Sequence, residues 1–385
     1  MTRAVSASLC HSPRAAYVHV PFCRHRCGYC NFTVVAGRDD LTAQYLQALQ
    51  CELESLGKAR KVDTLFVGGG TPTHLASQAL RRLLELIATW FPLNSSGEWS
   101  CEANPVDIDP QCVELLASHG VNRLSLGAQS FDPAKLTWLE RDHKAETIAQ
   151  AVQAAKTFIG NVSLDLIFAV PGEALDIWRR DLARAIELEP EHISTYGLTF
   201  ERGARFYADV QRGRVEQVDD ELQREMYLAA IETLEQAGYE HYEVSNFARP
   251  DYRCRHNEIY WSGDTYFGVG PGAARYVDGV RQVNHRSTST WMRRVLAGQS
   301  PAAESECLGA EDRAREAVVL GLRRIEGIDT RAFASRFGFD VESLLGDSLQ
   351  AFIERDLLIR ASGRLRLSRD GLLVSDSLWP KFLRR

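Results

Sequence analysis

The feature that most constrains the fold is an alternation of short apolar runs with amphipathic helical patterns, repeated six times before residue 240. The apolar runs cover residues 17–20, 64–67, 99–102, 123–126, 162–168 and 192–196. The helical patterns that follow them cover residues 41–56, 80–87, 112–118, 145–158, 176–188 and 220–236. Such alternation predicts parallel strands with helices outside them. Six units fit a partial (β/α)6 barrel better than a complete eightfold barrel, and a doubly wound open sheet is the competing architecture.

The pattern changes after residue 240. Residues 239–276 are rich in aromatic residues and glycine, and no clear helix is expected there. From residue 311 onward we expect three helices, a hairpin turning at Ser362-Gly363 and a final helix, with the second helix capped by Asp329 or Thr330. The third helix is expected over 341–354 and the final one over 372–383. These elements predict a small winged-helix-like α+β domain.

The chain therefore divides into four expected parts. They are a flexible N-terminal tail over 1–13, a barrel over 14–240, a connecting segment over 241–305 and the C-terminal domain over 306–385. The 385 residues carry a net charge of -6, which argues against a protein whose main task is to bind nucleic acid. A winged-helix domain raises DNA binding, but residues 311–385 hold 14 basic against 12 acidic residues, so a protein-packing module is favoured. The stretch before residue 16 does not resemble a secretory signal, and a cytoplasmic location is expected.

Nine cysteines are present, and three of them fall within eight residues, at Cys23, Cys27 and Cys30. An odd count in a long chain makes a disulfide framework a poor explanation, so metal binding or catalysis is the better use for the cluster. A zinc site normally has four nitrogen or sulfur ligands, and His25 lies awkwardly inside the first spacer. An iron–sulfur cluster is also held by thiolates. Chance clustering of core cysteines is a weak explanation, because the intervening residues are basic.

The spacing C-x3-C-x2-C, with Tyr29 before the last cysteine, resembles the signature of radical S-adenosylmethionine (SAM) enzymes. The preceding run Tyr-Val-His-Val-Pro-Phe over 17–22 narrows the resemblance to the oxygen-independent coproporphyrinogen III oxidases and the HemW haem chaperones. The resemblance extends over about 15–383. It implies that Cys23, Cys27 and Cys30 hold a [4Fe-4S] cluster whose fourth iron chelates the amino and carboxylate groups of SAM. Electron transfer from the cluster would then cleave SAM to methionine and a 5′-deoxyadenosyl radical.

A second motif, Gly68-Gly-Gly-Thr-Pro-Thr73, directly follows the second apolar run. Backbone without side chains can approach a ligand closely and expose N–H groups, although a glycine run after a strand is more often only a tight turn. The resemblance implies that Gly69, Gly70 and Thr71 hold the amino group of SAM.

Polar residues mark the ends of four later strands, at Glu102, Gln129, Asp165 and Thr199. Each alone is more often a satisfied structural group, but together they lie where the active sites of such barrels form. The resemblance adds Arg141 as a contact of the SAM carboxylate, and it places further residues beside the cofactor. The predicted SAM-binding set is Tyr17, Tyr29, Gly69, Gly70, Thr71, Glu102, Gln129, Arg141, Asp165, Thr199 and Ala274.

The last motif is His-Asn-Glu-Ile-Tyr-Trp over 256–261. It could be a packed hairpin, but within the resembled HemW group the motif H-N-x-x-Y-W recurs and its histidine is a candidate haem ligand. Neutral imidazole is well suited to haem iron. His256 is therefore the predicted haem ligand.

One position separates the two resembled groups. The oxidases carry a fourth cysteine two positions after the triad, where this chain has Phe32. The resemblance therefore favours a haem chaperone that binds a [4Fe-4S] cluster, SAM and haem, and that delivers haem to cytoplasmic or membrane-associated haemoproteins. An unidentified electron donor is a further expected partner. The alternatives are a coproporphyrinogen III oxidase, which is a radical enzyme of haem synthesis, and a structural zinc protein that contacts DNA.

Overall fold

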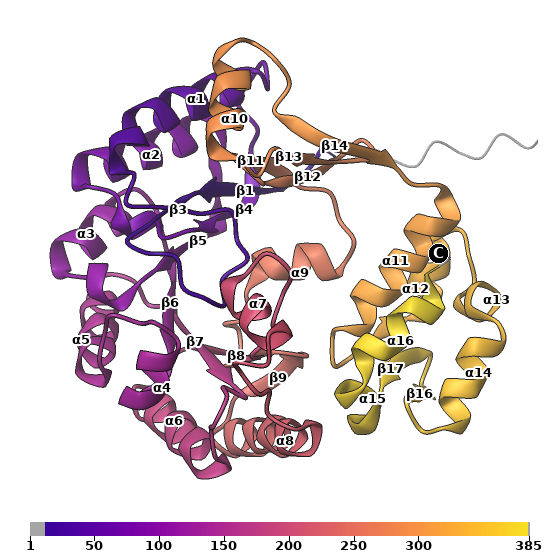
Figure 1. Cartoon of the computed structure of the whole chain (residues 1–385). Helices are drawn as coiled ribbons and strands as arrows, with labels where there is room; N and C mark the ends of the chain where they lie inside the picture. The colour runs from indigo at the N-terminus through magenta and orange to yellow at the C-terminus, as the bar shows by residue number, and fades with distance from the viewer. Residues whose placement is uncertain (1–11, 384–385) are drawn as a thin grey trace, which may run out of the picture.

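The computed structural model describes residues 12–383, so residues 1–11 of the expected N-terminal tail lie outside the described part. Six parallel strands form the centre of a nine-stranded sheet (Figure 1). They are β1 (Ala15–Val20), β4 (Val62–Gly69), β5 (Leu93–Ala103), β6 (Arg123–Gln129), β7 (Val162–Phe168) and β8 (His192–Gly197). Neighbouring strands follow the order of the chain without a reversal, which rules out the doubly wound alternative and confirms the partial barrel.

Helices cover the outer face of this sheet (Figure 1). The longer ones are α1 (Thr42–Glu54), α2 (Ser77–Trp90), α3 (Pro110–Ser118), α5 (Ala145–Lys156), α6 (Leu175–Glu187) and α8 (Asp220–Gln236). Local sequence sets where they begin: Asp109 accepts a hydrogen bond from the N–H of Cys112 and precedes Pro110 at the first turn of α3. Two short helices, α4 (Pro133–Trp138) and α7 (Arg205–Gln211), lie in the loops after β6 and β8. Two further strands of two residues each, β2 (Phe22–Cys23) and β3 (Val35–Ala36), flank the cysteine loop.

The inner face of the barrel is polar. Ser163 on β7 and His192 on β8 are fully buried and hydrogen-bonded to each other, with 2.8 Å between Ser163 Oγ and His192 Nδ1. His192 Nε2 is in turn 2.7 Å from the hydroxyl of Tyr242. Alternate residues of each strand point inward, so the apolar residues between these polar ones pack against the outer helices.

A buried ionic network holds the loops that leave β6 and β7. Lys135 Nζ lies 2.5 Å from Glu173 Oε1 and 2.9 Å from Asp181 Oδ2, and all three side chains are buried. Asp181 also accepts the N–H of Phe131, and Glu173 accepts the N–H of Val170. The ammonium group of Lys135 on α4 thus connects this helix to Asp181 on α6 and to Glu173 in the loop after β7.

The connecting segment contributes strands to the barrel sheet. β9 (Glu240–Glu243) and β10 (Asn246–Ala248) extend it antiparallel beyond β8, and β11 (Phe267–Val269) pairs in parallel with β1 at the other edge. The expectation of no helix between 239 and 276 was wrong, because α9 (Arg255–Trp261) lies there. Seven residues are too few to give a clear helical period in the sequence.

The rest of the connecting segment forms a three-stranded antiparallel sheet and one helix. The sheet comprises β12 (Ala274–Val277), β13 (Val280–Asn284) and β14 (Ala302–Cys307), and α10 (Thr288–Leu296) packs on α1. A buried carboxylate joins these parts: Glu52 of α1 accepts the N–H of Gly270 at 2.9 Å, the amide of Asn284 at 2.7 Å and the indole N–H of Trp291 at 3.0 Å. Burial raises the pKa of Glu52 to about 7.

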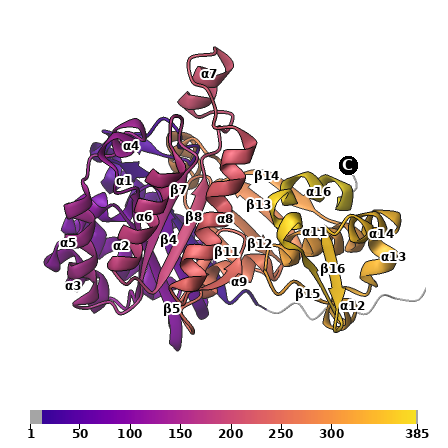
Figure 2. The same ribbon diagram turned by 90° about the horizontal axis from the view of Figure 1, so that it is seen from below.

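The C-terminal domain has its own hydrophobic core and lies beside the barrel (Figure 2). Its elements are α11 (Ala310–Leu322), β15 (Ile328–Asp329), α12 (Thr330–Phe337), α13 (Val341–Leu345), α14 (Asp347–Glu354), β16 (Leu358–Ala361), β17 (Arg364–Leu367), α15 (Arg369–Leu373) and α16 (Ser375–Phe382). The three strands form one small sheet, which confirms the predicted α+β character. The single helix expected over 341–354 is divided at Gly346, whose φ of +53° no helix accommodates, and the last helix is also two. No helix within residues 12–383 is long and apolar enough to cross a bilayer.

Candidate functional site

A cavity of about 480 Å³ opens at the carboxyl ends of the parallel strands. Cys23, Cys27 and Cys30 all line it, from the loop that leaves β1. The loop is held in shape by its backbone: the N–H of Cys30 donates to the carbonyl of Cys27 at 3.1 Å, and the N–H of Gly28 donates to Glu140 Oε2 at 2.7 Å. The predicted cysteine triad therefore faces one cavity.

The surroundings of the three thiols suit binding to a metal cluster. Burial raises the pKa of Cys23 to about 11 and also raises that of Cys30, so both groups are neutral thiols without a metal. Cationic iron would deprotonate them on binding. Cys27 Sγ lies 3.8 Å from the guanidinium of Arg141, so a positive charge adjoins this predicted ligand.

The three cysteines are the thiolate donors that an iron–sulfur cluster requires. A structural zinc site normally has four nitrogen or sulfur ligands. Within residues 12–383, no three His, Cys, Asp or Glu side chains are arranged as ligands of a single metal ion.

The glycine segment lies against the cysteine loop and has no room for side chains. A Cβ on Gly69, whose φ is +105°, would lie 2.2 Å from the ring of His19, and a Cβ on Gly70 would lie 2.6 Å from the carbonyl oxygen of Phe22. The amide groups of Gly69, Gly70 and Thr71 are all donated within the protein, to Glu102, Val20 and Phe22. The expectation of exposed N–H groups was therefore wrong, because all three donate within the protein.

Two carboxyl groups, those of Glu102 and Asp165, line the cavity. Burial raises the pKa of Glu102 to about 7, with Asp165 adding to the rise and the hydrogen bond from Gly69 opposing it. Burial also raises the pKa of Asp165, which accepts a hydrogen bond from Ser125 at 3.1 Å. Both groups would gain from a cationic ligand, which would restore their charged form.

Arg141 also lines the cavity. Its terminal nitrogens donate to the side chain of Asn104 and to the carbonyl of Gly127, but its Nε is buried without a hydrogen-bond partner among the described residues. A buried guanidinium nitrogen without a partner is costly and points to a ligand that accepts from it, such as a carboxylate. Nearby Gln129 has a φ of 63°, an uncommon conformation that is frequent at binding sites.

Most of the predicted SAM-binding residues converge on this cavity. Those that line it are Tyr29, Gly69, Gly70, Thr71, Glu102, Gln129, Arg141, Asp165 and Thr199. Tyr17 and Ala274 do not line it. The hydroxyl of Tyr17 is buried 3.0 Å from His19 Nδ1, and His19 Nε2 lies 2.7 Å from the carbonyl of Thr33, so Tyr17 supports the cysteine loop from behind.

His256 does not line the cavity. It lies on α9, which packs against β4 and β5. Its ring is buried, with Nδ1 3.0 Å from Thr64 Oγ1 and Nε2 2.8 Å from the hydroxyl of Tyr260. The first turn of α9 is held by Glu98, which accepts the N–H groups of Arg255 and His256. Because both ring nitrogens are already bonded, His256 has no nitrogen free for iron in this conformation.

Several further residues line the cavity that were not predicted from the sequence. Among them are Asn104, Ser125 and Tyr196. Asn104 follows the end of β5 and Tyr196 stands near the end of β8, so the rule that strand ends carry site residues would also have found them. Ser125 lies inside β6, where it donates to Asp165. Tyr196 is 43% exposed and lines the cavity.

Two family models match the chain. The model described as the radical SAM superfamily matches residues 17–185, which include the cysteines and the glycine segment. The model described as the HemN C-terminal domain matches residues 308–374.

Several curated proteins are similar along nearly the whole chain. The heme chaperone HemW of Bacillus subtilis (strain 168) is 32% identical over 96% of this chain and 99% of its own length. The heme chaperone HemW of Mycobacterium tuberculosis (strain H37Rv) is 35% identical over 92% of each chain. A solved structure, coproporphyrinogen III oxidase (HemN) from Escherichia coli, has a TM-score of 0.85 at 23% identity over 98% of this chain and 91% of that one, which establishes the shared fold. With identity of this size to HemW proteins over almost all of its length, the chain belongs to the HemW family of the radical SAM superfamily.

Proposed function

We propose that this protein is a haem chaperone, which binds a [4Fe-4S] cluster, SAM and haem and delivers the haem to recipient haemoproteins, some of them membrane-associated. The observation that supports the cofactor part is the convergence of Cys23, Cys27 and Cys30 on one cavity with nine predicted SAM-binding residues. The haem part is supported by the names of the relatives, which are heme chaperones.

Each part of the cavity has a task in this proposal. The three cysteines supply thiolates for the cluster, which when bound supplies one-electron chemistry. The carbonyls of the glycine segment and the carboxylate of Glu102 attract the ammonium group of SAM. Arg141 offers its unpartnered Nε to the carboxylate. The buried position of these groups strengthens their attraction for a charged ligand.

The test is a parallel assay under anaerobic conditions. The cluster-loaded protein is titrated with haem, and the same preparation is assayed for conversion of coproporphyrinogen III to protoporphyrinogen IX. We expect stoichiometric haem binding and transfer to an apo-haemoprotein, without turnover of coproporphyrinogen. Turnover without haem binding would establish the oxidase instead.

The cluster assignment has its own variant. Cys27→Ala should abolish the cluster, as read from iron and sulfide content and from visible absorbance. Cys112→Ala is the matched control, because Cys112 is partly buried on α3 outside the cavity. An unchanged cluster in Cys27→Ala would refute the assignment.

We propose His256 as the haem ligand, which requires that its Nε2 first gives up the hydrogen bond with the hydroxyl of Tyr260. Tyr260→Phe removes the competing hydroxyl. If Nε2 binds the iron, this variant should bind haem at least as tightly as the wild type, whereas His256→Gln should lose the spectrum of histidine-ligated haem. Unchanged haem spectra in His256→Gln would exclude this ligand.

A further inference from the structure

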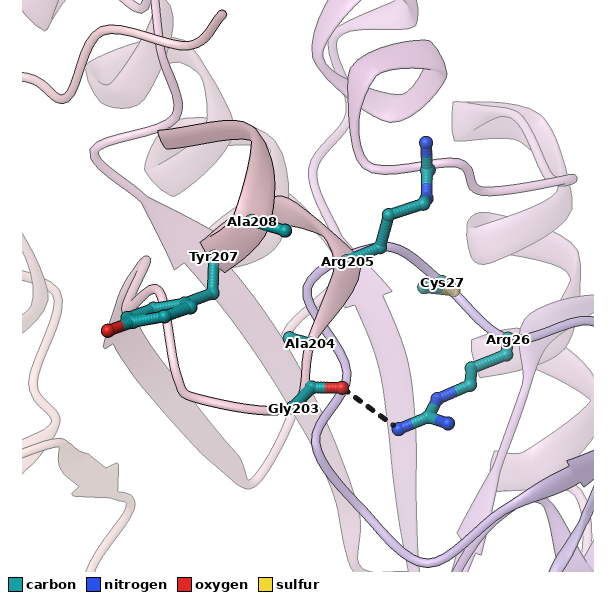
Figure 3. A pocket seen from close by; sticks show the side chains of 7 residues that line it. All are labelled: Arg26, Cys27, Gly203, Ala204, Arg205, Tyr207 and Ala208. Atoms are coloured by element: carbon teal, nitrogen blue, oxygen red, sulfur yellow. Dashed lines mark hydrogen bonds between the residues drawn. The ribbon is translucent and has the colours of Figure 1, made fainter. Parts of the chain in front are cut away.

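A second hollow, of about 400 Å³, lies outside the cofactor cavity and meets it at Cys27 (Figure 3). Its walls come from two segments: Arg26 and Cys27 of the cysteine loop, and residues 203–208 at the start of α7. Arg26 Nη2 lies 3.5 Å from the carbonyl oxygen of Gly203, as the dashed line shows. Cys27 is the one cysteine of the triad that lines both hollows, so this hollow reaches one of the three predicted cluster ligands.

Helix α7 packs against the cysteine loop. Phe206 is buried and its N–H donates to the carbonyl of Gly28 at 2.9 Å, between Cys27 and Cys30 in the chain. Gly28 has no space for a side chain, because a Cβ there would lie 2.2 Å from the Phe206 ring. The helix itself projects beyond the rest of the barrel (Figure 2). A protein that touches α7 therefore comes next to the loop that carries the cluster ligands.

The two charged residues that line this hollow, Arg26 and Arg205, are both basic, although the whole chain is acidic. Residues 198–214 carry four arginines and two acidic residues, in a chain with a net charge of -6. Arg205 is paired with Glu140. Arg214 is paired with Asp209. Arg26, which lines the hollow, and Arg202, which directly precedes the lining residue Gly203 in the chain, are exposed and form no ion pair with another residue of the described range 12–383.

We propose that this hollow is the docking site for an acidic redox protein that gives single electrons to the cluster. The inference rests on the cluster assignment of the proposed function. In the step, the donor loses one electron and the oxidised cluster gains it, and no bond or proton is exchanged. Positive charge beside Cys27 steers a negatively charged partner to the place where its redox group lies nearest the cluster.

The test measures reduction of the cluster directly. Protein with an assembled cluster is mixed anaerobically with a reduced flavodoxin, a small acidic one-electron carrier, and the bleaching of cluster absorbance is followed by stopped flow. The variant is Arg26→Glu combined with Arg202→Glu. We expect its second-order rate constant to fall about tenfold at low ionic strength, and the difference to shrink as salt is added.

Two controls separate docking from damage to the loop. Arg179→Glu makes the same charge change at an exposed residue of α6 that forms no ion pair within 12–383, and it should leave the rate unchanged. Reduced methyl viologen, a small cation that needs no docking site, should reduce the double variant at least as fast as the wild type, because the added negative charge does not repel it.

Several outcomes would overturn the inference. They are an equal rate with flavodoxin in the double variant, an equal slowing with methyl viologen, and an equal slowing in Arg179→Glu. Loss of the flavodoxin effect when inorganic phosphate is added at constant ionic strength would show an anion pocket instead. Failure of the wild-type protein to assemble a cluster would contradict the proposed function and not the docking site, because iron and sulfide content is measured first.

Discussion

Glu102 Oε2 accepts the amide N–H of Gly69 at 2.7 Å, which fastens the end of β5 to the glycine segment after β4. The same oxygen would be only 2.5 Å from a Cβ on Gly68, so the carboxylate needs glycine there. The acidic group and the glycine segment are thus one unit, in which a buried carboxyl group packs directly against the backbone of Gly68 and Gly69.

Replacing Glu102 by Gln tests the role of this charge. The amide oxygen can still accept from Gly69, but the negative charge is lost, so the affinity of the cluster-loaded protein for SAM should fall about tenfold. Because burial raises the pKa of Glu102 to about 7, the wild-type carboxyl takes up a proton as the pH falls below that value. Wild-type affinity should therefore decrease between pH 7.5 and pH 6, as measured by calorimetry. The variant has no such group, and an equal pH dependence in both proteins would contradict the assignment.

Gly69→Ala should destabilise the barrel strongly. The new Cβ would meet the ring of His19, which is buried and bonded at both nitrogens, and the φ of +105° is itself strained for alanine. We expect a loss of about 3 kcal/mol or more in the free energy of unfolding, measured by urea denaturation. Gly57→Ala is the control, because Gly57 has a φ of +75° and open space around it, and it should lose only about 1 kcal/mol. Equal losses would mean that the contact with His19 does not matter.

Lys135→Met should be among the most damaging substitutions away from the cavity. It leaves the buried carboxylates of Glu173 and Asp181 without their cation, at a cost of about 3–5 kcal/mol in the free energy of unfolding. Lys156→Met is the matched control, since Lys156 is one-third exposed and lies 3.6 Å from Glu191, and it should cost below about 1 kcal/mol. Adding Glu173→Gln and Asp181→Asn to Lys135→Met should recover part of the loss, which a simple packing defect would not allow.

His256 should make stability depend on pH. Burial lowers its pKa from 6.5 to about 3, so the folded protein keeps the ring neutral while the unfolded chain takes up a proton below pH 6.5. The contribution of the neutral, buried ring to the free energy of unfolding is fully present above pH 6.5 and is lost as the pH falls toward the folded-state pKa of about 3. Relative to His256→Gln, the wild type should lose about 2 kcal/mol of unfolding free energy between pH 7 and pH 5. A constant difference between the two proteins would show that the ring is protonated or exposed in the folded state.

The sequence was enough to predict the six barrel units, because each pairs a short apolar run with a helical period. The sequence also predicted that Cys23, Glu102 and Asp165 lie at one end of the barrel, because the carboxyl ends of parallel strands meet at one edge, and all three line the same cavity. It did not reveal α9, whose seven residues span two turns and whose buried residues include the polar His256. Nor could it show that both nitrogens of His256 are bonded, because Thr64 lies 192 residues away in the chain.

The pairing of β1 with β11 has a consequence for the order in which the chain becomes structured. Tyr17 lies opposite Gly268 in this pair, and Glu52 nearby needs hydrogen bonds from residues 218, 232 and 239 positions later. During synthesis the first strand and α1 leave the ribosome early, yet their partners follow only when three-quarters of the chain has been made. Until then one sheet edge and one buried carboxylate lack their partners, so this edge of the barrel is completed last and depends on contacts that are slow to form.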